Sequence, residues 1–463
     1  MTGHTLFPLR STFKTRGTSS GSASRQTLAT VIFLLFASAT HAQLTLSATV
    51  DLSLSHSPRI REAQANVAKA KASVGEAKDV YVPVITAGAG LGQAYGYSFN
   101  PPTLFVANAQ SLVFNFSQRD YIRASGSGLS AADLSLLDTR QSVVEDAATS
   151  FLALQHDQQR EATLLEENEI AGRLVQIVQD RLDAGRDNPI DLTQARLTAA
   201  NSRVARLSAA DDTNRDRAHL CVLTGVALGT NIQAEGDFPT TPLDFTEQPA
   251  FAIPASPAVS AAYASATSKL EQARGDSRYL YRPQVSLVVQ YNRYATFTAS
   301  FKQLQASNRA GTTIGANESV FGVQLEVPFL DRVHQAKARE ATAEARRALA
   351  VADSAQQAAV EGQLRLRHSL ELLRARAEVA QLDQQLARQQ LDVLTTELNA
   401  ASANPNAPVL TPKDEQNSHL VEREKYLAVI DANYQLHHAE ISLLRQTGQL
   451  QNWIQQAMKA SNP

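Results

Sequence analysis

Cysteine, aromatic residues and an excess of either charge are all scarce in this sequence. Cys221 is the single cysteine among 463 residues, so no internal disulfide can form, and its apolar neighbours favour a buried side chain. Aromatic residues make up 6% of the chain. Lys plus Arg number 43 against 45 Asp plus Glu, which leaves no basic excess. Because nucleic-acid binding needs a basic surface, no nucleic-acid partner is expected.

Long apolar runs are missing after the N-terminal region. Residues 1–42 contain basic residues but no acid, then the apolar run TLATVIFLLFASA and the small residues of ATHA. This pattern is typical of a secretory signal peptide, with cleavage after Ala42 or, alternatively, after Ala39. No uninterrupted apolar run of about 18 residues follows, so a mature chain that spans a membrane would have to do so as a closed β-barrel.

Motifs for catalysis and for cofactors are also missing. The sequence has no H-E-x-x-H, no G-x-x-x-x-G-K-[ST] and, after residue 42, no G-x-S-x-G. His437 and His438 are adjacent, so on a helix their side chains diverge. The glycines of VPVITAGAGLG, residues 82–92, are followed by prolines and not by a helix, which argues against a phosphate-binding loop. The sequence therefore predicts no enzyme, no cofactor and no metal site.

The remaining sequence consists of two similar repeats. In each half a Ser-Pro pair begins a helical stretch, with Ser as the cap and Pro at the first helical position, and a second proline ends that stretch and begins alternating residues. These residues are Ser57, Pro58 and Pro83 in the first half and Ser256, Pro257 and Pro283 in the second. We predict a first repeat at 43–225, a linker at 226–255 and a second repeat at 256–463.

Each repeat contains a pair of predicted strands. They lie at about 83–94 and 109–118, and at about 283–295 and 319–330. In the last strand one face is apolar, formed by Phe321, Val323, Leu325, Val327 and Phe329. Gln324 and Glu326 lie on the opposite face, which is therefore expected to be wet and to line a lumen. Four strands cannot close a barrel because small barrels need about eight, so several protomers must share one.

A long helical hairpin follows each strand pair. No proline occurs at 119–184 or at 331–404. A helix of about 65 residues is close to 100 Å long. Apolar residues recur at alternating steps of three and four, as in a coiled-coil seam; the seam residues are Leu372, Ala375, Val379, Leu382, Leu386, Gln389 and Val393.

Both hairpins turn at tips with matching cap residues, near 184–190 and near 401–412. The first tip has a C-terminal cap glycine followed by an N-cap, a proline and an acid, and the second repeats the last three of these. The residues are Gly185, Asn188, Pro189 and Asp191, then Thr411, Pro412 and Asp414. The returning helices are expected to end near Gly225 and Gly448.

The chain contains two copies of the order helix, strand pair and long helical hairpin, and its first tip reads RLDAGRDNPIDLTQAR. In this order and in this tip sequence it resembles the TolC family of outer-membrane efflux proteins. The resemblance covers essentially all of the mature chain. It implies a mainly α fold with a transmembrane β-barrel, in which a homotrimer shares twelve strands and an α-helical periplasmic tunnel. It also implies a passive exit duct in the outer membrane, in contact with its lipid, serving a tripartite efflux pump or a type I secretion system.

The same resemblance implies partners and site residues. A periplasmic membrane-fusion adaptor, joined to an inner-membrane pump, is expected to contact the first tip at Arg181, Ala184, Gly185 and Asp191. The second tip lacks the glycine and is longer, so it departs from the family pattern. Acidic tip residues are the candidates for a gate, and they are Asp183, Asp187, Asp191, Asp414 and Glu415. An alternative for Asp191 and Asp414 is that they only complement helix N-termini.

A second function class is an exported periplasmic coiled-coil scaffold without a pore. Such a scaffold does not need four strands that each have one apolar and one polar face. Fractionation separates the two hypotheses, since a pore requires detergent for extraction and a scaffold does not. On the channel hypothesis, substitutions of Glu326 are expected to alter conductance more than assembly.

Overall fold

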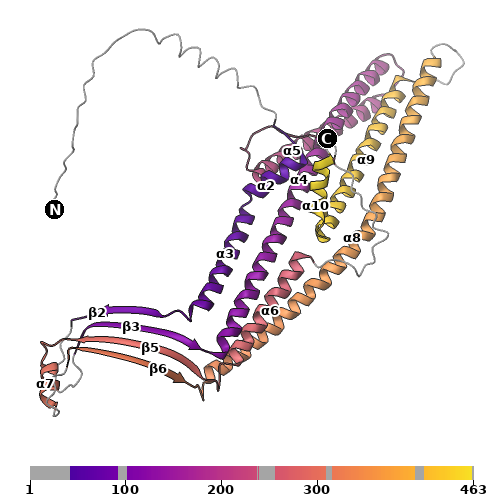
Figure 1. Ribbon diagram of the computed structural model, residues 1–463. Helices are drawn as coiled ribbons and strands as arrows, with labels where there is room; N and C mark the ends of the chain where they lie inside the picture. Colours follow the sequence, from indigo (N-terminus) through magenta and orange to yellow (C-terminus); the bar gives the residue numbers. More distant parts are fainter. Residues whose placement is uncertain are drawn as a thin grey trace, which may run out of the picture.

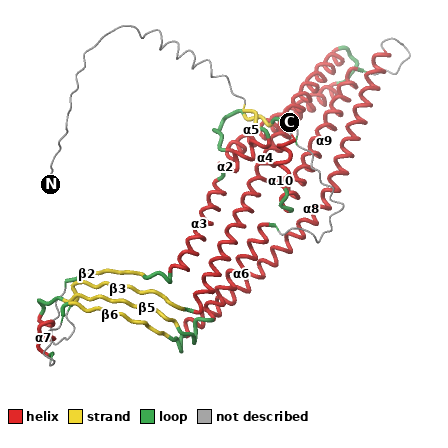
Figure 2. The backbone as a smooth tube through the Cα atoms, viewed as in Figure 1, coloured by secondary structure: helices red, strands yellow, loops and turns green. Residues whose placement is uncertain are grey.

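The protein is an elongated molecule with a small sheet at one end and a long helical body at the other (Figures 1 and 2). A computed structural model describes residues 42–91, 102–236, 238, 256–308, 315–401 and 411–460. The expected signal peptide, apart from Ala42, therefore lies outside the described residues, as do most of the linker at 226–255 and residues 402–410 of the second tip. None of the described helices has a stretch long and apolar enough to cross a bilayer.

Four antiparallel strands form the sheet, in the order β2-β3-β5-β6. Their bounds are β2 (Val84–Ala89), β3 (Thr103–Phe114), β5 (Gln284–Tyr294) and β6 (Asn317–Glu326). The β3–β5 pair joins the first repeat to the second, so the sheet is continuous across both repeats. The three longer strands have 12, 11 and 10 residues, about the length that a tilted strand needs to cross a bilayer.

The strand pairing sorts the side chains into one apolar and one polar face. Because cross-strand partners share a face, the pairs Val285–Leu325 and Leu287–Val323 extend the predicted apolar face of β6 onto β5. The apolar face continues through Ala109 of β3 to Ile85 of β2. The polar face carries Gln110, Ser286, Gln290, Asn292, Glu318, Gln324 and Glu326. The predicted division into two faces is confirmed by this register, although the polar face also holds Val106, Val288 and Val320.

Two predicted strand positions are wrong at their ends. The strand expected at 109–118 begins earlier, at Thr103, and ends at Phe114, because the Asn115 side chain accepts the N–H of Ser117 and begins the next helix. The strand expected at 319–330 runs from Asn317 to Glu326 instead. There the chain leaves the sheet, and the carbonyl of Pro328 accepts the N–H of Tyr281 across a 3.2 Å hydrogen bond.

The other two strands lie closer to prediction. The strand expected at 283–295 is β5, one residue shorter at each end. The strand expected at 83–94 is β2, which ends at Ala89, and residues 92–94 lie outside the described residues.

Six helices build the body, three from each repeat, in matching order. The first repeat has α3 (Pro58–Asp79), α4 (Phe116–Asp183) and α5 (Pro189–Thr224), and the second has α6 (Pro257–Ser277), α8 (Arg332–Ala401) and α9 (Pro412–Gln446). Near the sheet they pack side by side in the order α3-α4-α6-α8, and further away in the order α5-α4-α9-α8. The helices α4 and α8 have 68 and 70 residues, so each is about 100 Å long. Both therefore take part in the packing near the sheet and in the packing further away.

A collar of short elements surrounds the middle of α4, and the sequence did not predict it. It consists of β1 (Ala42–Leu44), paired in parallel with β4 (Ile232–Ala234), and of α2 (Leu46–His56) and α10 (Leu450–Ala460). Phe151 of α4, Leu450 and Trp453 of α10 and Val50 of α2 share one hydrophobic core. A further helix, α7 (Ala299–Ser307), lies in the β5–β6 connection, where no helix was predicted.

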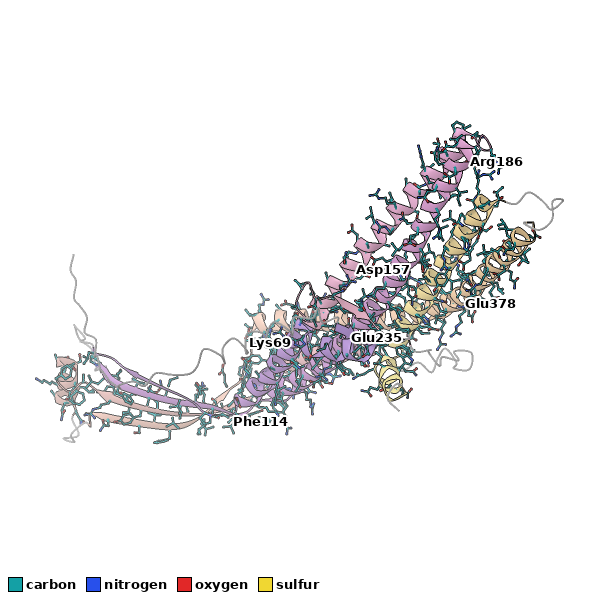
Figure 3. All side chains as sticks on the ribbon, turned by 90° about the horizontal axis from the view of Figure 1, so that it is seen from above. Lys69, Phe114, Asp157, Arg186, Glu235 and Glu378 are labelled. Carbon is teal, nitrogen blue, oxygen red and sulfur yellow. The ribbon has the colours of Figure 1, made fainter. Side chains whose placement is uncertain are left out.

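The junction between sheet and helices is held by polar contacts between the two repeats. The Tyr121 hydroxyl of α4 donates a 2.6 Å hydrogen bond to buried Asp276 of α6. Arg278 lies 2.8 Å from Asp120, which is also buried. Figure 3 labels Phe114 at this boundary. These contacts fix the direction in which the strands enter the helical body.

Gly275 lies against the ring of Tyr121, and alanine is expected to be costly there. A Cβ atom at this position would lie 2.7 Å from Cε1 of Tyr121. We expect Gly275→Ala to lower the free energy of unfolding by about 1–3 kcal/mol through overpacking, measured by thermal unfolding in detergent. Gly172 of α4 is a matched control, since a Cβ there meets no atom within 4 Å. Gly172→Ala is expected to be neutral or slightly stabilising, and equal effects of the two would contradict the packing argument.

Candidate functional site

The polar face of the sheet contains the predicted lumen residues and one that was missed. Gln324 and Glu326 both lie on it, near the end of β6 that meets the helices. Glu318 lies on the same face at the other end of the strand, paired with Asn292. The Asn292 amide donates a 3.2 Å hydrogen bond to Glu318 Oε2, and the Tyr294 hydroxyl donates to the same oxygen. The polar face thus carries carboxylates at both of its ends.

The first hairpin tip closes as the cap residues predict. Gly185 has φ of 70°, in the left-handed region that favours glycine. The N–H of Arg186 donates to the carbonyl of Arg181 at 2.8 Å, and Gly185 N–H donates to Leu182 at 2.9 Å, which together form a Schellman motif. Ala184 is the helix C-cap. Figure 3 labels Arg186 at this far end of the molecule.

Two predicted tip residues form a forked ion pair across this turn. The Nε and Nη2 atoms of Arg181 each donate a 3.0 Å hydrogen bond to a carboxylate oxygen of Asp187. This bond holds the pKa of Asp187 below and the pKa of Arg181 above their ordinary values. Both groups are therefore charged at neutral pH and already paired with each other.

Asp191 connects the first tip to the second. Lys413 of α9 donates a 3.0 Å hydrogen bond to Asp191 Oδ1, and Asn188 forms a capping box with Asp191 at the start of α5. The bond from Lys413, followed by the backbone bond from Asn188, lowers the pKa of Asp191. We call the Lys413–Asp191 pair the tip clasp, because it is the polar bond that joins the beginnings of α5 and α9.

The remaining gate candidates are not brought into one group. Asp183 is exposed and accepts a 3.0 Å hydrogen bond from Gln179. Asp414 accepts hydrogen bonds from the backbone and the hydroxyl of Thr411 at 2.9 and 2.7 Å, so it caps α9. Glu415 follows it in the first turn. The capping alternative for Asp191 and Asp414 is thus supported within the protomer, and Asp191 has the clasp in addition.

The predicted seam on α8 does not hold the hairpin together within the protomer. All seven seam residues are exposed, with Leu386 at 54%. The side of α8 that packs on α9 uses a different row of residues, Leu370, Ala377, Ala387 and Leu391, which are buried. At 3.6 residues per turn the two rows lie on opposite faces of the helix. The seam faces away from the rest of its own chain.

A similar apolar row faces outward on α5, the opposite edge of the helical layer. Ile190, Leu197 and Val204 recur at steps of seven and are exposed, with Ile190 at 73%. The buried residues of α5, among them Leu192, Ala195 and Ala209, face α4 instead. We call the exposed row the α5 stripe. Apolar heptad rows of this kind are typical of coiled-coil contacts.

Edges without a partner in the same chain, which we call open edges, therefore occur in the described sheet and along the helical body. In the described sheet, β2 and β6 each pair on one side only. Near the sheet, the helix layer ends at α3 and α8, and further away it ends at α5 and α8. An unpaired strand edge and a solvated apolar heptad row are both costly for an isolated protomer.

A buried ionisable cluster lies midway along α4, where Figure 3 labels Asp157. The side chain of His156 is 11% exposed, and its Nδ1 and Nε2 atoms lie 2.8 Å from Asp157 and Asp431, respectively. Burial lowers the pKa of His156, but the hydrogen bonds with the two carboxylates outweigh this and raise it to about 9. An imidazole with a carboxylate at each nitrogen donates from both, so His156 is a cation.

Two neighbours complete this cluster. The Tyr434 ring of α9 lies 4.5 Å from the imidazole of His156, between ring centres. Burial and the charge of Asp157 raise the pKa of Asp216 on α5. Three helices from both repeats thus meet at this cluster. His156 and Asp431 are 275 residues apart, which is why no sequence pattern indicated the pair.

In the part of the chain that the structure describes, no group of three or more His, Cys, Asp or Glu residues is arranged so that it could hold a metal ion. His437 contacts Glu440 at 3.2 Å, and its ring packs 5.1 Å from that of Phe238. Cys221 is buried and packs against Leu154 and Leu220. These residues therefore have structural contacts.

Comparison with known proteins gives a family and a fold. Residues 49–226 match the outer membrane efflux protein family. No curated protein sequence matches the chain. The CmeC outer membrane channel of Campylobacter jejuni has a TM-score of 0.71 at 16% identity, covering 88% of this chain and 86% of that one. VceC from Vibrio cholerae has a TM-score of 0.71 at 18% identity, covering 87% and 96%.

A third solved channel has the same fold. The MtrE outer membrane channel of Neisseria gonorrhoeae, solved in its open state, has a TM-score of 0.63 at 15% identity, covering 88% of this chain and 89% of that one. The structural matches span both repeats, whereas the family match covers the first. The first repeat therefore matches the outer membrane efflux protein family, and the chain as a whole has the fold of solved outer-membrane channels.

Proposed function

We propose that three copies of this protein assemble head to tail into one exit duct of a tripartite efflux pump or type I secretion system. The duct conducts substrate passively from the periplasm to the exterior. The observation that carries this proposal is the set of open edges, which are present in the sheet and in both helix layers. The alternative of a periplasmic scaffold gives no reason for a sheet with one largely apolar face.

The contacts between the two repeats supply a template for the contacts between protomers. Within the chain, β3 pairs with β5, α4 packs on α6, and α4 packs on α9. Because the second repeat has the same elements as the first, it is expected to make the same contacts with the next copy of the chain. In these contacts β6 pairs with β2 of the next copy, and α8 packs on α3 and α5 of that copy. The last of these places the α8 seam against the α5 stripe. Head-to-tail contacts of this kind close into a ring.

Closure of the ring by three protomers gives twelve strands, enough for a barrel with an open lumen. The apolar face of the sheet then contacts outer-membrane lipid, and the polar face with Gln324 and Glu326 lines a wet lumen. Aromatic side chains at both ends of the sheet support this placement, since Phe105 and Tyr291 lie at the outer end and Phe114 lies at the inner end. Aromatic girdles of this kind are typical of membrane interfaces.

The tips are the proposed contact surface for a periplasmic membrane-fusion adaptor that connects the duct to an inner-membrane pump. Arg181, Ala184, Gly185 and Asp191 all belong to the first tip. Because Arg181 is already paired with Asp187, its role is to shape the turn, and Ala184 and Gly185 are the accessible backbone for a partner.

Planar-bilayer recording of the detergent-extracted protein tests this proposal. We expect stepwise conductance from the trimer and extraction only in the presence of detergent. A protein that is released from the periplasm without detergent and forms no conducting unit would support the scaffold instead.

The tip clasp is expected to hold the periplasmic end of the duct closed. Lys413→Gln removes the charge that pairs with Asp191. Because the proposed trimer would lose three such ion pairs, the open population is expected to rise roughly tenfold, measured as mean conductance in bilayers. Lys425→Gln is the matched control, because Lys425 pairs with Asp383 away from the tips, at 3.4 Å. Equal conductance in both variants would rule out the clasp as a gate.

A further inference from the structure

The charges on the described strands are distributed unevenly between the two faces of the sheet. Arg293, Glu318 and Glu326 are the charged residues of these strands. The pairing places Glu318 opposite Asn292 on the polar face and Arg293 opposite Asn317 on the apolar face. The polar face of the described strands thus has two acids and no base.

Glu318 is held in one position by donors from the neighbouring strand. The Tyr294 hydroxyl and the Asn292 amide both donate to its Oε2 atom, and Gln290 donates a 3.1 Å hydrogen bond to Asn292 Oδ1. These four side chains form a connected polar row on β5 and β6. Hydrogen bonds from neutral donors favour the ionised carboxylate and restrict its movement.

The backbone at the end of β5, next to this polar row, forms hydrogen bonds with the segments on both sides. The N–H of Tyr294 donates to the carbonyl of Ala316 at 2.8 Å, and the N–H of Ala295 donates to Pro102 at 2.9 Å. These bonds join the outer ends of β3, β5 and β6. The height of Glu318 along the barrel is therefore fixed by the strands themselves.

We propose that three copies of Glu318 form a carboxylate ring at the outer end of the lumen and make the duct selective for cations. The inference rests on the trimeric channel proposed above. A threefold axis brings equivalent residues to the same height, and a ring of carboxylates concentrates cations and repels anions. Glu318 is thus a selectivity residue, and Tyr294 and Asn292 are positioning residues. Positively charged and neutral solutes are expected to pass the outer end more readily than anions.

Reversal potentials in planar bilayers under a KCl gradient test the ring. Wild type is expected to prefer K⁺ over Cl⁻. Glu318→Gln keeps the size of the side chain and is expected to lower the ratio of K⁺ to Cl⁻ permeability at least about twofold. Glu318→Lys is expected to move the preference toward Cl⁻. Glu318→Ser is a second neutral variant, so a failure of Glu318→Gln to assemble leaves the test intact.

Arg293→Gln is the matched control, since it removes a charge at the same height from the opposite face. It is expected to leave the permeability ratio unchanged. Glu326→Gln measures the contribution of the inner end of the lumen separately. An unchanged ratio in conducting Glu318→Gln and Glu318→Ser channels would overturn the Glu318 ring while leaving the channel in place. A wild-type protein that forms no conducting unit would overturn both.

Discussion

Leu386→Glu is expected to convert the trimer into folded monomers. Leu386 lies in the middle of the α8 seam and is 54% exposed in the protomer, so a glutamate there is tolerated by the isolated chain. In the proposed trimer the next copy covers the seam, and an uncompensated buried carboxylate would cost about 3–5 kcal/mol at each of three interfaces. Native mass spectrometry of the detergent-extracted protein measures the change, and circular dichroism shows whether the helices remain.

Gln381→Glu is the matched control for this prediction. Gln381 is exposed on the same helix and does not belong to the seam; at 3.6 residues per turn it lies beside the row that packs on α9, well away from the seam. It introduces the same charge and is expected to leave the trimer intact. If Leu386→Glu remains trimeric, the seam is not the protomer interface. If it loses its helicity, Leu386 stabilises the protomer itself.

His156→Gln is expected to destabilise each protomer and to remove a pH dependence. The pKa of His156 is about 9 in the folded protein against about 6.5 in an unfolded chain. Because the folded value is the higher one, the charged imidazole stabilises the fold fully below about pH 6.5, and this contribution is lost as the pH rises through 9. The difference corresponds to on the order of 3 kcal/mol.

Thermal unfolding in detergent at a series of pH values measures this effect. We expect the melting temperature of the wild type to fall between about pH 6.5 and pH 9.5. His156→Gln is expected to start lower and to change less over the same window. His419→Gln, on α9 near the tip, is the control and should keep the wild-type slope. A wild-type melting temperature that is flat over this range would contradict the assignment of a charged His156.

The features that the sequence predicted correctly are those set by neighbours along the chain. Strand faces follow from alternation, and the register confirms them through Leu325 and Glu326. The tip turn follows from Gly185, Asn188 and Pro189, whose roles depend only on local backbone geometry. The long helices follow from the lack of proline and from heptad spacing.

The features that could not be predicted depend on residues far apart in the chain. The spacing of the α8 seam indicates a coiled coil, but spacing cannot tell whether the partner is α9 or another copy. Only the burial of Leu370 and Leu391 on the opposite face shows that α9 is not the partner. The collar around α4 brings Trp453 against Phe151, and no local pattern connects them. Strand ends moved because helix caps such as Asn115 compete for the same residues.

The central claim is that the open edges of the protomer are closed by copies of itself. The most direct test is the mass of the mature, detergent-extracted protein by light scattering, after the contribution of the detergent is subtracted. The account predicts three protomers in a particle that comes from the outer-membrane fraction. A monomer that stays in solution without detergent would contradict it, because the seam, the stripe and both strand edges would then be exposed to water.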